Sequence, residues 1–509
     1  MVLSLDGQGP LYAQVTRALV ALVRRRVLPP GSRAPATREL ARDLGCSRNV
    51  VLLAYEQLLV EGYFVSRQRE GTFVALDLKQ PPAAPSGASG DPSAGGAKAR
   101  LSGHGRRVVR ATRDTIGAIR HQPVCAIDFI YGLCEPDDRL LRRLRRALSQ
   151  PLRERAFSYG PPAGDAALRE QIATRLRSAR AISRPADHVV LTSGTQQALD
   201  ICARILLDPG DRVVVEEPGY EVATAVFRAA GARVLHARVD RDGLDPKHLP
   251  AGRRPPRLVY VTPSHQFPTG SVMPVARRHA LVAWARRARA YVFEDDYDGE
   301  FRYAGQPVPA LAGLDPEAVI YCGTFAKSLF PSCRLGYLVL PPALVAPAVQ
   351  CKWLADRGSS RLVERAIGEL LASGHYDRHI RRRQRRYRER RDVLVRSLRR
   401  HLGAEVEIEG SSAGLHLVAW LKALPPDRVH DVVAACRERG IGVYPLSRHA
   451  ARPLGRAALL LGYGLVGVDD IERGVRELAD ACRQVRARMG LPRSTGEYVT
   501  AMAGGTTPR

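Results

Sequence analysis

Lys327 is the side chain of this sequence with the clearest capacity for chemistry. The chain holds 78 lysines and arginines, of which only six are lysines, and Lys327 follows an apolar run in VIYCGTFAKSLFPSCRLGYLVL. A neutral lysine amine can condense with an aldehyde to form a Schiff base. An aldehyde cofactor with a pyridine ring and a phosphate also needs a carboxylate for the ring nitrogen, a donor for the ring hydroxyl and a cradle for the phosphate.

The sequence supplies each of these parts directly after a strand-like run. The segment YVFEDDYDGEF offers a carboxylate at Asp295 and a phenol at Tyr297, and Tyr220 in EEPGYEV can cover one face of the ring. The segment LTSGTQQALD is typical of a strand, a tight turn and a helix, and free N–H groups at a helix N-terminus favour a phosphate. The residues expected at the phosphate are Gly194, Thr195, Gln196, Thr324 and Arg334. Together they predict a site for pyridoxal 5'-phosphate, with Lys327 as the catalytic residue.

Alternating apolar and helical segments must position these residues. The runs HVVLT, RVVVEE, RLVYVT, AYVFED and AVIYCG recur between residues 188 and 323, with helical or turn-forming stretches between them. This alternation predicts an α/β domain built on a mostly parallel sheet with both faces covered. Ligands of such sheets bind at the carboxyl ends of the strands, where the candidate residues fall.

Residues 1–78 have the pattern of a separate head. LYAQVTRALVALVRRRVL carries a helical apolar stripe, and a short helix is predicted after it, with Thr37 as its cap and Gly45 at its end. CSRNVVLLAYEQLLVEGY predicts a second short helix capped by Ser47, and YFVSRQREGTFVAL a two-stranded hairpin. Two short helices around a tight turn, followed by a hairpin, form the layout of a winged helix-turn-helix.

The predicted DNA contacts lie on the two short helices and at the hairpin tip. The N-terminal residues of the second helix of such a motif reach base edges in the major groove, and a basic hairpin reaches the neighbouring backbone. The residues we expect to contact a double-stranded operator are Arg38, Ser47, Arg48, Asn49, Arg67 and Arg69.

The charge distribution does not by itself single out this head. The chain has a net charge of +27, which indicates a polyanionic partner, yet residues 1–78 hold ten arginines against seven acids. Residues 79–100 are dense in Pro, Gly, Ala and Ser, which predicts a flexible linker. We extend this linker through residue 124, followed by a body over 125–490 and a tail over 491–509. A long arginine-rich helix is expected over 381–400, either as a solvated face or as a surface for phosphates.

The remaining bulk features exclude several classes of protein. No apolar run is long enough to span a bilayer, and the first residues lack the layout of a signal peptide. The nine cysteines are scattered without metal-ligand spacing. We therefore predict a cytoplasmic protein with no membrane partner and no metal site.

Longer motifs resemble known families. PPGSRAPATRELARDLGCSRNVVLLAYEQLLVEGYF, followed by GTFV, resembles the winged-helix domain of the GntR regulators. FSYGPPAGDAALREQIA and GTFAKSLFPSCRLGY resemble motifs of fold-type I, class I aminotransferases. That resemblance implies that Lys327 bonds the cofactor, that Arg334 binds its phosphate and that Tyr159 reaches the phosphate site of a partner subunit, in a homodimer. Head, linker and body together resemble the MocR/GabR group of transcription regulators.

Two positions depart from the aminotransferase pattern. The asparagine that usually precedes Pro-Thr-Gly and contacts the ring hydroxyl is Phe267 here, so His265 or Gln266 is expected to replace it. The arginine that usually grips the substrate carboxylate aligns with Leu460.

The arginine that GabR-like proteins carry two residues after the Pro-Gly-Tyr tyrosine is replaced in this chain by Val222. Arg448 is a possible substitute for a carboxylate grip. The effector is accordingly an amine, an amino acid or pyridoxal phosphate itself.

Two functions are therefore weighed. The first is a DNA-binding regulator whose aminotransferase-like body senses the effector. The alternative is an active pyridoxal-phosphate-dependent aminotransferase with an appended DNA-binding module. The complete head and the missing carboxylate arginine favour the regulator.

Overall fold

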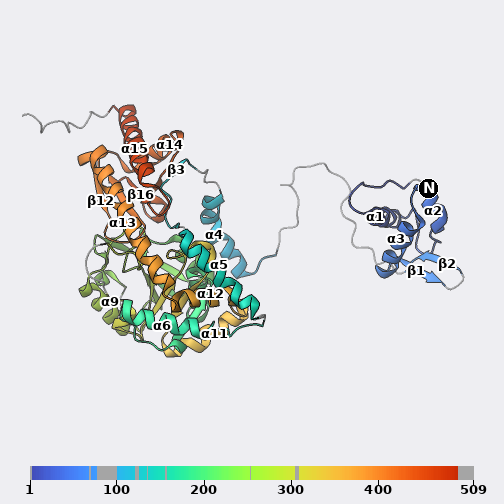
Figure 1. Cartoon of the computed structure of the whole chain (residues 1–509), viewed down its shortest axis with the longest axis horizontal. Coiled ribbons are helices and arrows are strands. Elements are labelled where there is room, and N and C mark those ends of the chain that lie inside the picture. Colours follow the sequence, from blue (N-terminus) through green and yellow to red (C-terminus); the bar gives the residue numbers. More distant parts are fainter. Residues whose placement is uncertain are drawn as a thin grey trace, which may run out of the picture. The chain divides into compact units, whose positions relative to one another are not determined.

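The chain forms two compact units, Met1–Ala99 and Arg100–Arg509 (Figure 1). A computed structural model describes residues 3–67, 70–76, 100–120, 125–134, 136–154, 158–250, 252, 254–303 and 309–490. Each unit has a hydrophobic core of its own. The predicted tail over 491–509 lies outside the described residues.

The first unit has three helices and a hairpin. Its elements are α1 (Leu11–Arg24), α2 (Thr37–Asp43), α3 (Arg48–Val60), β1 (Phe64–Arg67) and β2 (Gly71–Val74). The two strands pair antiparallel, with Phe64 opposite Val74 and Arg67 opposite Gly71. Leu19 of α1, Leu58 of α3 and Phe64 are fully buried together, so the apolar stripe predicted for α1 forms the core of a winged helix-turn-helix.

The ends of the two short helices differ in detail from the prediction. α2 begins at Thr37 itself, after Ala36, and the Thr37 hydroxyl accepts a hydrogen bond from Nε of Arg48 at 3.4 Å. Ser47 precedes α3 as expected, but its side chain makes no capping hydrogen bond. A cap prediction fixes the helix boundary to within a residue or two, because neighbouring side chains compete for the same hydroxyl.

Part of the predicted linker is helical. Helix α4 (Gly103–Arg120) packs against α8 (Glu221–Ala230), and Nε of Arg107 donates to the carbonyl of Ala229 at 3.1 Å. The few apolar residues of this segment suggested a linker, yet one narrow apolar stripe is enough for a helix that packs on a neighbour. Residues 79–99 and 121–124 of the predicted linker lie outside the described residues.

The second unit is built around an eight-stranded sheet. Its strands lie in the order β4-β11-β10-β9-β8-β5-β6-β7. Strands β10, β9, β8, β5 and β6 run parallel to their neighbours, whereas β11 and β7 pair antiparallel. The bounds are β4 (Val189–Thr192), β5 (Arg212–Glu217), β6 (Arg233–Asp240), β7 (Gly243–Leu244), β8 (Leu258–Val261), β9 (Tyr291–Asp296), β10 (Val319–Thr324) and β11 (Gly336–Val339).

Helices cover both faces of this sheet, which confirms the predicted α/β class. Along β5, Val213 and Val215 join one buried cluster while Val214 joins the other. This alternation follows from the two-residue period of a strand. The helices around the sheet are α5 (Asp138–Arg153), α6 (Ala166–Arg180), α7 (Thr195–Leu206), α8, α9 (Val275–Ala288), α10 (Leu311–Leu314), α11 (Pro342–Asp356) and α12 (Arg361–Ala372).

A smaller sheet follows the long helix α13 (His375–Leu402), which includes the arginine-rich run (Figure 1). It contains β12 (Val406–Glu409), β13 (His416–Leu421), β16 (Ala458–Gly462) and β15 (Tyr444–Pro445), in that order. β3 (Ile127–Asp128) pairs with β14 (Ile441–Gly442), and α14 (Val429–Glu438) and α15 (Val468–Arg488) complete the subdomain. None of the described helices is long and apolar enough to cross a membrane.

Candidate functional site

The candidate cofactor residues converge at one edge of the large sheet. Strands β5, β8, β9 and β10 are mutually parallel, so the segments that follow their carboxyl ends meet. Asp295 of β9 lies opposite Cys322 of β10, and Lys327 comes three residues after the end of β10. Strand pairing therefore brings together residues that are far apart in the sequence.

Asp295 is a buried carboxylate with one oxygen left open. Its exposed fraction is 4%, and Oδ2 accepts a hydrogen bond from the hydroxyl of Tyr260 at 2.8 Å. Oδ1 is buried and has no hydrogen-bond partner among the described residues. Burial raises the pKa of Asp295 to about 7. A protonated ring nitrogen would supply both the missing partner and the charge that stabilises the carboxylate, so this acid fits a pyridine ring.

Lys327 has the properties of a reactive amine. Its Nζ donates to the carbonyl of Gly132 at 2.5 Å, and burial lowers the pKa of the amine. A lowered pKa increases the neutral fraction that can attack an aldehyde. A Cβ added to Gly132 would lie 3.1 Å from Nζ, so glycine leaves space beside this amine.

The phosphate candidates gather at the start of α7. Gly194 precedes α7 with a φ of 98°, and a Cβ on it would lie 3.8 Å from Nη1 of Arg334. The amides of the first helical turn, which starts at Thr195, have no acceptor within the helix. The hydroxyl of Thr324 accepts from the amide of Ala326 at 3.1 Å, which ties it to the turn before Lys327. A helix N-terminus beside a guanidinium fits a phosphate.

The side chains of Gln196 and Tyr159, both predicted to contact a phosphate, point to solvent in this structure. The side chain of Gln196 is exposed, so at this position the backbone amide is the group suited to the phosphate. Tyr159 is 80% exposed, with the guanidinium of Arg357 5.0 Å from the centre of its ring.

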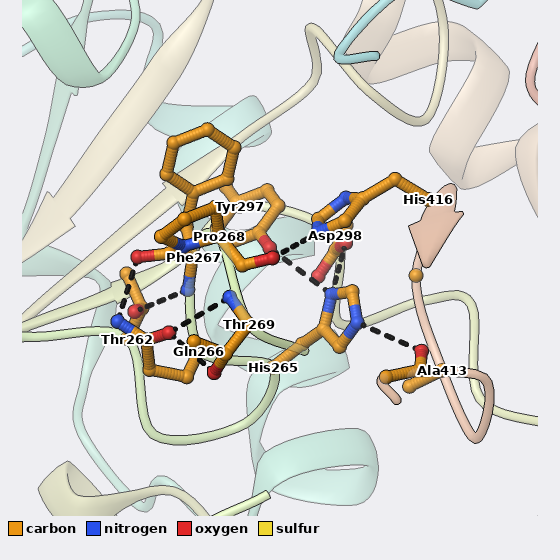
Figure 2. Close-up of polar contacts among 12 residues, drawn as sticks. Thr262, His265, Gln266, Phe267, Pro268, Thr269, Tyr297, Asp298, Ala413 and His416 are labelled. Carbon is orange, nitrogen blue, oxygen red and sulfur yellow. Dashed lines mark hydrogen bonds and ion pairs between the residues drawn. The ribbon is translucent and has the colours of Figure 1, made fainter. Parts of the chain in front are cut away.

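Tyr297 is held by a buried histidine, as Figure 2 shows. Nδ1 of His265 lies 2.8 Å from Oδ2 of Asp298 and 3.0 Å from the Tyr297 hydroxyl. His416, at the start of β13, donates through Nε2 to the carbonyl of Pro268 at 3.2 Å. The network thus joins the loops after β8 and β9 to the small sheet and fixes the phenol.

The ligand-type atoms of His265, Asp298 and His416 lie within 4.8 Å of one another. The hydrogen bonds just described account for this grouping. Burial also lowers the pKa of His416 well below its usual value, so its imidazole is neutral.

The side chain of Gln266 stabilises the loop after β8 and contacts none of the described cofactor candidates. Its Nε2 donates to the carbonyl of Pro218 at 3.0 Å and to Oε2 of Glu216 at 3.2 Å, while Oε1 accepts from the amide and hydroxyl of Thr269. The Gln266 amide is therefore engaged on both sides. Of the two residues expected to replace the missing asparagine, His265 is the one that contacts a cofactor candidate, Tyr297.

Aromatic rings line the side of the site where an arginine is missing. Phe267 contacts Tyr220 at 5.9 Å and Tyr131 at 5.8 Å between ring centres. Leu460 is fully buried in the adjoining apolar cluster, which also includes Phe267 and Tyr131. Burial, followed by the charge of Asp295, raises the pKa of the Tyr220 phenol. This wall offers apolar contact where an aminotransferase would offer a guanidinium.

His449 and Glu221 form a polar contact beside this apolar wall. Nδ1 of His449 lies 2.7 Å from Oε2 of Glu221, and Nε2 of His449 is buried without a hydrogen-bond partner among the described residues. Arg448 is exposed; burial raises the pKa of Tyr131, and the positive charge of Arg448 opposes this rise.

The DNA candidates of the head lie on its surface. Ser47, Arg48 and Asn49 are exposed at the N-terminus of α3, and Arg38 is exposed on α2. Arg67 is exposed at the hairpin end, with its guanidinium 4.6 Å from the centre of the Phe73 ring. Arg69 lies outside the described residues. The exposed N-terminus of α3 suits entry into a major groove.

Fold and site together define a winged helix-turn-helix head on an aminotransferase-type body that holds a half-buried lysine beside a buried aspartate. The pattern of the family Aminotransferase class I and II matches residues 133–460, and that of the bacterial regulatory proteins of the gntR family matches residues 11–74.

Two relatives match this chain over both the head and the body. The probable rhizopine catabolism regulatory protein MocR of Rhizobium meliloti is 36% identical over 506 residues, covering 97% of this chain and 98% of the relative. The pyridoxine biosynthesis transcriptional regulator PdxR of Corynebacterium glutamicum is 29% identical over 92% of this chain and 95% of its own. LysN, the α-aminoadipate aminotransferase of Thermus thermophilus, was solved with N-(5'-phosphopyridoxyl)-L-leucine. Its structure matches 74% of this chain and 98% of its own, with 28% identity and a TM-score of 0.64.

The chain therefore belongs to the GntR family of bacterial transcription regulators, in the MocR/GabR group that joins such a head to an aminotransferase-like body. The predicted family, fold and regulator class are confirmed.

Sequence reasoning missed several residues of the site. Tyr260 lies inside an apolar strand run, where a phenol resembles any other core residue. Asp298 was visible in EDDYDGEF, but nothing in the sequence pairs it with His265. The Gly132 carbonyl that receives Lys327 has no sequence signal, because any residue provides a carbonyl.

Proposed function

We propose that this regulator binds pyridoxal 5'-phosphate at Lys327 and uses it to sense an amine, so that effector binding in the body changes operator binding by the head. The single observation that carries the cofactor assignment is the buried, unpartnered Oδ1 of Asp295 beside the Lys327 segment. An unpaired buried carboxylate is unfavourable unless a positively charged group completes it.

In this proposal each side chain has a distinct task. When bound, the cofactor supplies an electrophilic carbon and an electron-withdrawing ring. Lys327 would hold the aldehyde carbon covalently, Asp295 would keep the ring nitrogen protonated, and Tyr297, fixed by His265, would donate to the ring hydroxyl. Arg334, Thr324 and the first amides of α7 hold the phosphate. Tyr220 covers one ring face.

The regulator is proposed to act as a homodimer on two operator half-sites. The exposed Tyr159 is proposed to reach the partner subunit's phosphate site, because its motif resembles the one that takes this role in class I aminotransferases and its side chain is 80% exposed. Two heads on one dimer would read two half-sites of the operator.

The proposed effector is an amine, an amino acid or pyridoxal phosphate itself. An amine effector would compete with Lys327 for the cofactor's aldehyde carbon. The apolar wall at Phe267 and Leu460 favours an amine without a carboxylate, although Arg448 leaves a route for an amino acid. The relative PdxR is a pyridoxine biosynthesis transcriptional regulator, which keeps pyridoxal phosphate among the candidates.

The test measures the cofactor spectrum and the DNA affinity of the same protein. Full-length, cofactor-loaded protein is titrated with amines and matched amino acids while the visible spectrum and the affinity for a footprinted DNA site are recorded. A sensor gives a spectral change and a change in DNA affinity at the same effector concentration, because a ligand acts only through its differential affinity for two states. Sustained transamination with unchanged DNA affinity would instead establish an aminotransferase with an appended DNA module.

A further inference from the structure

A groove between α5 and α13 concentrates positive charge on the body. Two adjoining hollows, of about 360 Å³ each, lie along these helices. Together they are lined by eight arginines and only two aspartates. Since residues 1–78 hold ten arginines against seven acids, most of the net charge of +27 resides outside the head.

The arginines form two stripes. Arg139, Arg142, Arg143 and Arg146 follow the i, i+3, i+4, i+7 spacing that places side chains on one face of α5. Arg378, Arg382 and Arg386 follow the i, i+4, i+8 spacing on α13. At 1.5 Å per residue each stripe is roughly 10–12 Å long, which corresponds to about three phosphates along one DNA strand.

The acids of the groove do not neutralise these stripes. Asp137 caps α5 by accepting from the amide of Leu140 at 2.7 Å, and it also accepts from Nε of Arg382 at 2.7 Å. Asp138, at the start of α5, is the other acid. Among the described residues, no ion pair involves the four arginines of the α5 stripe.

Some exposed arginines elsewhere on the body are paired within their own helix. On α15, Arg473 pairs with Asp470 at 2.6 Å and Arg483 pairs with Asp480 at 2.5 Å. Like charges one helical turn apart lower helix stability. The unpaired α5 arginines face the α13 stripe, in which Arg382 alone has an acidic partner among the described residues, so this array of like charge is unfavourable until an anion enters the groove.

The positive electrostatic potential of the groove affects His375, which lines one of the two hollows. Partial burial, and then the charges of Arg143 and Arg378, lower the pKa of this imidazole. Arginines of both helices thus act on the same point.

We propose that the groove between α5 and α13 binds the phosphate backbone of the DNA that the head recognises. The polyanion is DNA because the chain belongs to a family of DNA-binding regulators. Guanidinium groups in a stripe recognise phosphates without reading bases, so the groove adds affinity and salt dependence but no sequence preference.

The test uses the full-length, cofactor-loaded protein and a 60-base-pair duplex containing the footprinted site. The variant Arg142→Gln/Arg143→Gln/Arg146→Gln is compared with Arg473→Gln/Arg476→Gln/Arg483→Gln, which removes the same charge from α15. Affinity is measured over a range of salt concentrations. Each lost phosphate contact makes the slope of log K against log salt shallower by about 0.9, so the α5 variant is expected to change it by roughly 2–3. The α15 variant is expected to keep the wild-type slope.

A third variant carries lysine at the same three α5 positions and separates charge from packing. It is expected to keep the steep slope, because lysine also binds phosphate as a point charge. The proposal is overturned if the α5 glutamine variant has the wild-type salt slope. It is also overturned if the α5 and α15 glutamine variants change this slope equally. It is also overturned if the α5 variant loses binding to single-stranded RNA or an acidic peptide while its DNA slope stays the same. The visible cofactor band shows that each variant is folded.

Discussion

The hydroxyl of Tyr260 donates to Oδ2 of Asp295 at 2.8 Å, while Oδ1 of the same carboxylate is buried without a partner among the described residues. Tyr260 on β8 and Asp295 on β9 belong to neighbouring parallel strands. The phenol fixes the orientation of the carboxylate and leaves one oxygen for a bound group. The half-satisfied acid is thus prepared for a partner that the described residues do not supply.

The raised pKa of Asp295 gives a prediction for the cofactor-free protein. The pKa is about 7 in the folded chain against a usual value of 3.8. The carboxyl of Asp295 therefore stays protonated to a higher pH in the folded state than in the unfolded state. As a consequence, the free energy of unfolding falls as pH rises from about 4 to about 7. A shift of this size corresponds to at most about 4 kcal/mol.

Asp295→Asn should remove that loss, so thermal melts of cofactor-free protein should show a smaller fall in Tm over this pH range than in the wild type. Glu216 and Glu294 also have a pKa of about 7, but they contribute equally to both proteins. Identical pH profiles would contradict the burial of an unpaired Asp295.

Lys327→Ala should abolish the visible absorption of bound cofactor, because no other amine is proposed to bond the aldehyde. Absorption spectra and borohydride reduction followed by peptide mapping measure this. Lys247→Ala, which removes an exposed lysine, is the matched control and should behave as the wild type. A reducible adduct that persists in Lys327→Ala would place the bond at another residue.

Arg48→Ala should weaken specific DNA binding by about 1–3 kcal/mol and lower the ratio of specific to non-specific affinity, because Arg48 lies at the exposed N-terminus of α3. Binding titrations with the footprinted site and with unrelated DNA measure both effects. The cofactor spectrum should not change. Arg473→Ala on α15 controls for the loss of one positive charge, and equal losses in the two variants would remove Arg48 from the interface.

Removal of residues 1–99 should leave a folded body that binds the cofactor, because the two units have separate cores. Removal of residues 1–124 also deletes α4 and exposes the surface of α8 that it covers, so the Tm should fall. Melting curves and visible spectra of the two truncations provide the comparison. Equal Tm values would show that α4 contributes nothing to the stability of the body.

The sequence by itself determined the fold class, the family and the cofactor candidates. Alternating apolar and helical runs are local patterns, and they identified the parallel sheet and the edge at which Asp295 and Lys327 lie. The positions of Arg334 in a turn and of Arg48 at a helix start were likewise predictable, because a turn or a helix start depends on neighbours in the chain, whereas their roles stay predictions.

Only the tertiary structure decided which side chains are paired. It engaged Gln266 within its loop and placed His265 against Tyr297, although the two are neighbours in the sequence just before Phe267 and Pro-Thr-Gly. It also brought the arginines of α5 and α13 to one groove, although more than 200 residues separate them. Partner choice depends on contacts between distant segments, and these contacts arise only when the whole chain packs.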